Sequence, residues 1–96
     1  MFAWYIGYKE IQRQLEILSY QWRAADPEDK AEIRTKYKRL RQDCVIHWAT
    51  ASDLDLGEAC QAAKDSKDKC EQGWTLEKMK TLRSRYLKQI PKYRIQ

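Results

Sequence analysis

The residues of this chain that could carry chemistry are three cysteines and one histidine. Cys44 and His47 are three positions apart, so a helix would present both on one face, and Cys60 and Cys70 fall on one stripe of a later segment. Such a set would suit structural zinc, which binds its ligands at about 2.3 Å. On a continuous helix, however, Cys60 and Cys70 would lie roughly 15 Å apart. We therefore expect no metal site and no cofactor, unless that helix breaks.

Catalytic groups are no easier to assemble. His47 with a cysteine is the only pair that could activate a thiolate, but His47 lies beside Trp48 in an apolar seam, and no oxyanion hole or orienting carboxylate is visible. The paired acids Asp53 and Asp55 stand where helix caps are expected. We therefore expect a protein that is not an enzyme and that keeps its cysteines reduced.

The composition indicates one helical domain. The chain has 96 residues, of which 34% are charged and 43% hydrophobic, with only three glycines and two prolines to form turns. Neither a membrane-spanning window nor a signal peptide is visible, and an odd number of cysteines fits reduced thiols. We expect residues 1–96 to form one all-α domain in the cytoplasm, without a membrane partner.

The hydrophobic pattern predicts a long N-terminal antiparallel hairpin of two helices, at about residues 3–25 and 27–51. Pro27 ends the first helix and suits the first turn of the second, with Asp26 as its N-cap. Apolar residues recur every three or four positions in both helices. The seam of the first helix is Trp4, Tyr8, Ile11, Leu15, Leu18 and Trp22, and that of the second is Ile33, Tyr37, Leu40, Cys44, His47 or Trp48, and Ala51.

Two shorter helices are predicted to follow, at about residues 54–72 and 75–90, which gives a small bundle of three or four helices. Ser52 and Asp55 approximate a capping box for the first of them. Gly73 can end that helix in a left-handed conformation, and Thr75 can cap the next. The last helix is expected to stop before Pro91, which leaves residues 91–96 as a basic tail that can be flexible.

The first helix also carries a second apolar stripe, nearly opposite the seam. Two interpretations stay open. The shorter helices can cover the stripe, with an acid of the third helix pairing with Arg13 in its middle. Alternatively, the stripe stays exposed and binds a partner, because exposed aromatic patches rimmed by charge mark interfaces. The candidate contact residues on this second interpretation are Phe2, Tyr5, Ile6, Arg13, Ile17 and Tyr20.

Positive charge gathers mid-hairpin, in "KYKRLRQ", and near the C-terminal end, where Glu77 is the only acid between Trp74 and Gln96. Such residues can solvate a helix face, pair with the acidic third helix, or contact an acidic partner or the phosphates of a nucleic acid. The candidate contacts are Lys36, Lys38, Arg39, Arg41, Arg83, Arg85, Lys88, Lys92, Tyr93 and Arg94.

The leading hypothesis is a non-catalytic protein-interaction module that docks on a larger protein and modulates or inhibits it. The partner can itself be a protein that handles nucleic acid. In general style the chain resembles accessory proteins of phages and mobile elements that bind a host protein, a resemblance that assigns no residue a role. One alternative is a small basic nucleic-acid-binding protein that uses the C-terminal helix and tail. The other is a homo-oligomeric helical structural protein.

Overall fold

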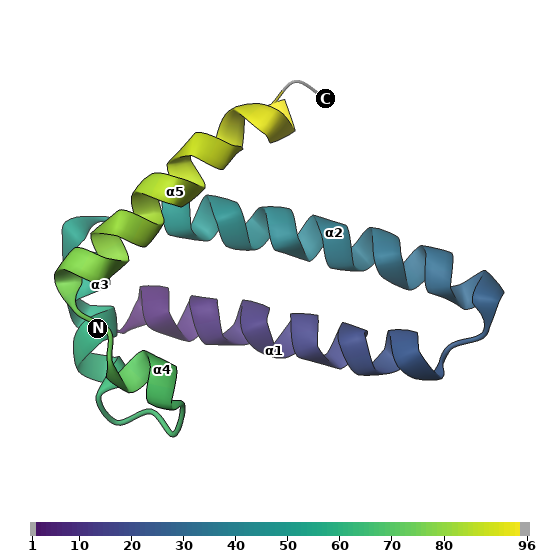
Figure 1. Ribbon diagram of the computed structural model, residues 1–96, viewed down its shortest axis with the longest axis horizontal. Coiled ribbons are helices and arrows are strands. Elements are labelled where there is room, and N and C mark those ends of the chain that lie inside the picture. The colour runs from purple at the N-terminus through teal and green to yellow at the C-terminus, as the bar shows by residue number, and fades with distance from the viewer. Residues whose placement is uncertain (1, 95–96) are drawn as a thin grey trace.

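The computed structural model describes the backbone of residues 2–94 and the side chains of residues 2–91. Within this range the chain forms five helices and no strand (Figure 1). The helices are α1 (Ala3–Ala24), α2 (Pro27–Ala49), α3 (Asp53–Ala63), α4 (Lys69–Gln72) and α5 (Leu76–Arg94). The predicted all-α fold, built on a long N-terminal hairpin, is confirmed.

The hairpin consists of α1 and α2, which run antiparallel along their length (Figure 1). They have 22 and 23 residues, so each is about 33 to 35 Å long. Pro27 is the first residue of α2, as predicted, and Glu28 and Asp29 lie in its positively polarised first turn. Asp26 has the extended backbone of an N-cap, but its side chain makes no capping hydrogen bond.

The other helices gather at the end of the hairpin that holds the start of α1 and the end of α2. There α3 packs on α1, and α5 packs on α2 and α3 (Figure 1). The opposite end, where residues 25 and 26 join α1 to α2, extends away from α3, α4 and α5. The described chain therefore consists of a body, where α3, α4 and α5 pack on one end of the hairpin, and an arm, which is the projecting remainder of α1 and α2.

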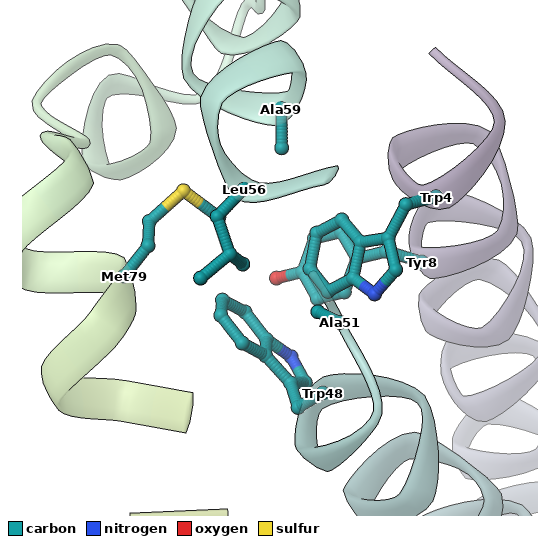
Figure 2. Close-up of a cluster of buried hydrophobic side chains, with 7 residues drawn as sticks. All are labelled: Trp4, Tyr8, Trp48, Ala51, Leu56, Ala59 and Met79. Atoms are coloured by element: carbon teal, nitrogen blue, oxygen red, sulfur yellow. The ribbon is translucent and has the colours of Figure 1, made fainter. Parts of the chain in front are cut away.

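The hydrophobic core lies in that body (Figure 2). Trp48 is at its centre, with ring centroids 4.9 Å from Trp4, 5.6 Å from Tyr8 and 5.3 Å from Tyr86. Trp74, from the segment before α5, completes this group of rings at 6.0 Å from Trp48. The buried cluster is Trp4, Tyr8, Trp48, Ala51, Leu56, Ala59 and Met79.

The predicted continuous helix over 54–72 is wrong, because the chain leaves helical geometry after Ala63 and forms only the short α4 later. Polar side chains in the intervening segment bind backbone groups that a continuous helix would use. The Ser66 hydroxyl accepts a hydrogen bond from the Asp68 amide, and the Asp68 carboxylate accepts one from the Cys70 amide. Such local bonds compete with the helix and favour a turn.

Four helix termini can be compared with their predictions. The Ser52–Asp55 capping box is present, with both bonds at 3.0 Å, and Thr75 accepts a bond from the Lys78 amide. Gly73 is not left-handed, since its φ is −86°. The predicted stop before Pro91 is also wrong, because α5 continues to Arg94. Pro91 is exposed in the last turn, where its missing N–H removes one hydrogen bond.

Candidate protein-interaction surface

The aromatic residues of α1 divide between two opposite faces. On the inner face Trp4, Tyr8 and Leu18 are buried, because the three- and four-residue spacing directs them toward α2 and α3. Towards the hairpin tip this seam becomes shallower, and Trp22 is exposed, with Lys30 Nζ 4.4 Å from its ring centroid. Only some of the large side chains in this aromatic-rich helix are therefore buried in the core, and the others stay exposed.

The second stripe is uncovered. Phe2 is 42% exposed, Ile6 65%, Ile17 41% and Tyr20 61%. The interpretation in which the shorter helices bury this stripe is therefore wrong, because α3 packs on another side of α1 and the backbone of α5 does not approach that of α1. We call the surface formed by Phe2, Ile6, Glu10, Arg13, Ile17 and Tyr20 the outer face of α1.

Charge occupies the middle of the outer face. Arg13 Nη2 lies 3.0 Å from Glu10 Oε1, one turn earlier on the same helix, and both side chains are exposed. Gln14 donates a second hydrogen bond to Glu10, and together with Arg13 it lowers the pKa of the Glu10 carboxyl. Arg13 is therefore paired with an acid of its own helix. The interpretation with a covered stripe expected an acid of the third helix instead.

A buried acid does bind α1, but at a different position. Glu71 of α4 is 2% exposed, and its carboxylate accepts bonds of 2.6 Å from Lys9 Nζ and from the Tyr5 hydroxyl. Burial and the bond to Glu71 raise the pKa of Tyr5. Burial alone would lower the pKa of Lys9, but Glu71 reverses this and raises it. Tyr5, a predicted contact residue, is therefore half-buried and holds α4 against α1.

A shallow apolar pocket lies near the hairpin tip, between α1 and α2. Its lining residues are Ser19, Trp22, Ile33, Arg34 and Tyr37. The pocket exists because no third helix covers the arm at this level. It adds to the apolar surface that the arm leaves accessible.

The basic residues of α2 do not form one patch. Lys36, Lys38, Arg39 and Arg41 are all exposed, but successive helical residues point about 100° apart, so the run winds around the helix. Lys36 also lies 3.6 Å from Glu32, one turn earlier. Lys36 and Arg39 share one side of α2, and Lys38 and Arg41, which are also three positions apart, share another.

The basic residues of α5 have different environments. Arg83 is engaged within the chain, where it contacts Asp53 at 2.8 Å and donates to the Ala51 carbonyl at 3.0 Å. Arg85 and Lys88 are exposed. The side chains of the remaining candidates lie outside the described residues, and these candidates are Lys92, Tyr93 and Arg94.

The residues first considered for chemistry are dispersed. Cys44 is half-buried and its pKa is raised by burial, as is that of Cys60, whose thiol donates to Met79 Sδ at 3.2 Å. Cys70 is exposed. His47 packs on Trp4 with ring centroids 4.9 Å apart. Although the helix after Cys60 does break, no group of three His, Cys, Asp or Glu residues within the described range could hold a metal ion.

Comparison with known proteins found no family model, no curated protein and no solved structure that matches this chain. None of the described helices has the length and apolar character needed to cross a membrane. The case for a function therefore depends on the surfaces described above.

Proposed function

We propose that this chain is a non-catalytic interaction module that binds a protein partner through the outer face of α1. The observation that carries the proposal is the exposure of four large apolar side chains on one side of a single helix, with an arginine between them. Aromatic residues and arginine contribute much of the binding energy at protein interfaces. A module of this kind modulates or inhibits its partner by occupying a surface.

The energetics fit a binding surface of moderate strength. Burying a large apolar side chain stabilises an interface by about 1.5 to 3 kcal/mol when the burial is complete. Phe2, Ile6, Ile17 and Tyr20 are already partly covered by their own helix, so together they would contribute several kcal/mol. A micromolar complex requires about 8 kcal/mol of binding free energy. The outer face alone falls short of this value, so a micromolar complex also needs contacts around it.

The test compares binding by variants that differ only in where a charge is placed. Ile6→Glu and Ile17→Glu each put a carboxylate on the outer face, and Leu54→Glu puts one on α3, where Leu54 is 73% exposed. The measured quantity is the amount of partner protein that becomes cross-linked to the chain. We expect Ile6→Glu and Ile17→Glu to reduce this amount at least about tenfold, and Leu54→Glu to leave it unchanged. Equal melting temperatures would show that all three variants fold. Undiminished capture by Ile6→Glu and Ile17→Glu would refute the proposal.

A second candidate function is nucleic-acid binding along the seam between α2 and α5. It is favoured by the position of Arg41, which lines the same pocket as Tyr86 of α5, a tyrosine whose pKa is raised by burial. Arg85 and Lys88 add exposed positive charge on α5. On this model the affinity for a DNA duplex falls steeply with salt, with a slope near −0.9 for each phosphate neutralised. A salt-independent affinity would remove this candidate.

A further inference from the structure

We infer that the partner for which the outer face of α1 is suited is a second copy of this chain, with the two α1 helices packed antiparallel about a two-fold axis. This inference rests on the proposed function, because it names the partner of the same surface. In the dimer Ile6 of each copy packs on Ile17 of the other, and Glu10 of each copy pairs with Arg13 of the other.

The order of residues along the outer face carries the inference. Reading along the helix, the stripe has an aromatic residue, an isoleucine, an acid, a base, an isoleucine and an aromatic residue. The midpoint between Ile6 and Ile17 falls between residues 11 and 12, and so does the midpoint between Glu10 and Arg13. A single two-fold axis there matches apolar with apolar and acid with base at the same time.

The aromatic ends follow the same register. The same two-fold axis that places Ile6 of one copy opposite Ile17 of the other brings Tyr20 opposite Ala3, beside Phe2. The small side chain at position 3 leaves room for a tyrosine ring. Phe2 and Tyr20, which are exposed in the isolated chain, would therefore cover one another across the interface.

Charge selects the antiparallel arrangement over the parallel one. In a parallel two-fold pair Glu10 would face Glu10 of the other copy and Arg13 would face Arg13, and like charges in an interface oppose association. In the antiparallel pair the existing contact of 3.0 Å between Glu10 and Arg13 extends into a network of two acids and two bases. A two-fold contact is also closed, so association stops at the dimer.

The shape of the chain permits this arrangement. The arm of one copy is bare at its tip, while α3 and α4 lie near the start of α1 (Figure 1). Antiparallel pairing places the bare tip of each arm beside the start of α1 in the other copy. A strip along α1 about 33 Å long and 10 Å wide covers roughly 330 Å² per copy, less than the 800 Å² of a standard interface. We therefore expect a weak dimer that forms only at high protein concentration.

The test is a charge exchange followed by sedimentation velocity over a range of protein concentrations. Glu10→Arg and Arg13→Glu each create two like-charge pairs in the dimer, so each variant alone should raise the dissociation constant at least about tenfold. An equimolar mixture of the two variants should form a heterodimer with near wild-type affinity, because every facing pair is then opposite in charge. The double variant Glu10→Arg/Arg13→Glu should dimerise by itself for the same reason.

The controls separate this inference from the function on which it rests. Circular dichroism must show equal helix content for all variants. A wild-type chain that remains monomeric up to about 1 mM, or a mixture that shows no rescue, overturns the inference. If the chain is monomeric while Ile6→Glu abolishes capture of a foreign protein, the inference fails and the proposed function stands. If Ile6→Glu and Ile17→Glu change neither self-association nor capture, both fail.

Discussion

Trp4 and His47 are joined by two reciprocal hydrogen bonds. The Trp4 indole Nε1 donates to the His47 backbone carbonyl at 2.9 Å, and His47 Nε2 lies 2.8 Å from the Trp4 backbone carbonyl. Because a carbonyl only accepts, this geometry assigns the imidazole proton to Nε2. The histidine that first suggested chemistry therefore fastens the start of α1 to the end of α2.

The glycines of α1 and α3 provide a matched test of this contact. A Cβ at Gly7 would lie 2.9 Å from His47 Cε1, whereas one at Gly57 would have no atom within 4 Å. Gly7→Ala should displace the imidazole and lower the free energy of unfolding by about 1 to 2 kcal/mol, despite the better helix propensity of alanine. Gly57→Ala should raise it by about 0.5 to 1 kcal/mol. Urea denaturation measures both, and equal stabilisation by both variants would show that the imidazole is not held.

The contact of Glu71 with Lys9 and Tyr5 predicts that removal of the Glu71 carboxylate destabilises the fold. Breaking a fully buried ion pair costs about 3 to 5 kcal/mol, but Lys9 is 41% exposed and can turn to water. We therefore expect Glu71→Ala to lower the free energy of unfolding by about 2 kcal/mol. A double-mutant cycle with Lys9→Ala should give a coupling energy of about 1 kcal/mol.

The loss of stability in Glu71→Ala could also come from the shorter side chain and not from the missing charge. Glu71→Gln keeps the shape and an acceptor for the Tyr5 hydroxyl while removing the charge, so it should cost less than Glu71→Ala. A loss below about 0.5 kcal/mol in Glu71→Ala would mean that α4 does not depend on this contact.

Asp53 should make stability depend on acid pH. The hydrogen bond from Arg83 and the charge of Lys80 hold the Asp53 pKa below its ordinary value of 3.8. A carboxyl with a depressed pKa stabilises the fold above that ordinary value, and the contribution is lost as pH falls through the folded-state pKa. The melting temperature of Asp53→Asn should therefore lie below wild type above about pH 5 and converge with it in stronger acid.

Arg83→Gln is the control for this pH effect, because it removes the cation and leaves the carboxyl in place. Titration of the Asp53 carboxyl carbon by NMR should then give a pKa closer to 3.8 than in the wild type. An unchanged Asp53 pKa in this variant would contradict the assigned cause.

The three cysteines should differ in alkylation rate. The thiolate is the reactive form, and burial raises the pKa of Cys44 and Cys60, whereas Cys70 is exposed. Iodoacetamide should modify Cys70 first, at least about tenfold faster than the other two, as read by peptide mass spectrometry. The three rates should converge in urea, and equal rates in the folded protein would contradict the burial of Cys44 and Cys60.

Local signals in the sequence were sufficient to predict the hairpin. The predicted helices 3–25 and 27–51 compare with α1 at Ala3–Ala24 and α2 at Pro27–Ala49. A regular apolar spacing defines each helix, and Pro27 fixes the point between them. The break after Ala63 was missed because Cys60, Ala63 and Cys70 continue a plausible stripe, while the competing bonds of the intervening polar side chains leave no periodic trace.

The candidate surface was only half predictable. Periodicity identified two apolar stripes on α1, but which of them is covered depends on where distant segments pack. Glu71 shows the difficulty, since it binds Tyr5 and Lys9 across 66 and 62 positions, and no pattern near Glu71 distinguishes it from exposed acids. Trp74 and Tyr86 likewise reach the ring of Trp48 only in the folded chain.

The core cluster, which joins Trp4 to Met79, has a consequence for the chain during synthesis. The hairpin of α1 and α2 can assemble from local contacts as it leaves the ribosome. The cluster stays incomplete, however, until α5 emerges and supplies Met79. A nascent or prematurely terminated chain that ends before Met79 would keep Trp4, Tyr8 and Trp48 open to water. Such transient exposure invites chaperone binding and aggregation, so truncation near the C-terminal side should affect solubility more than helix content.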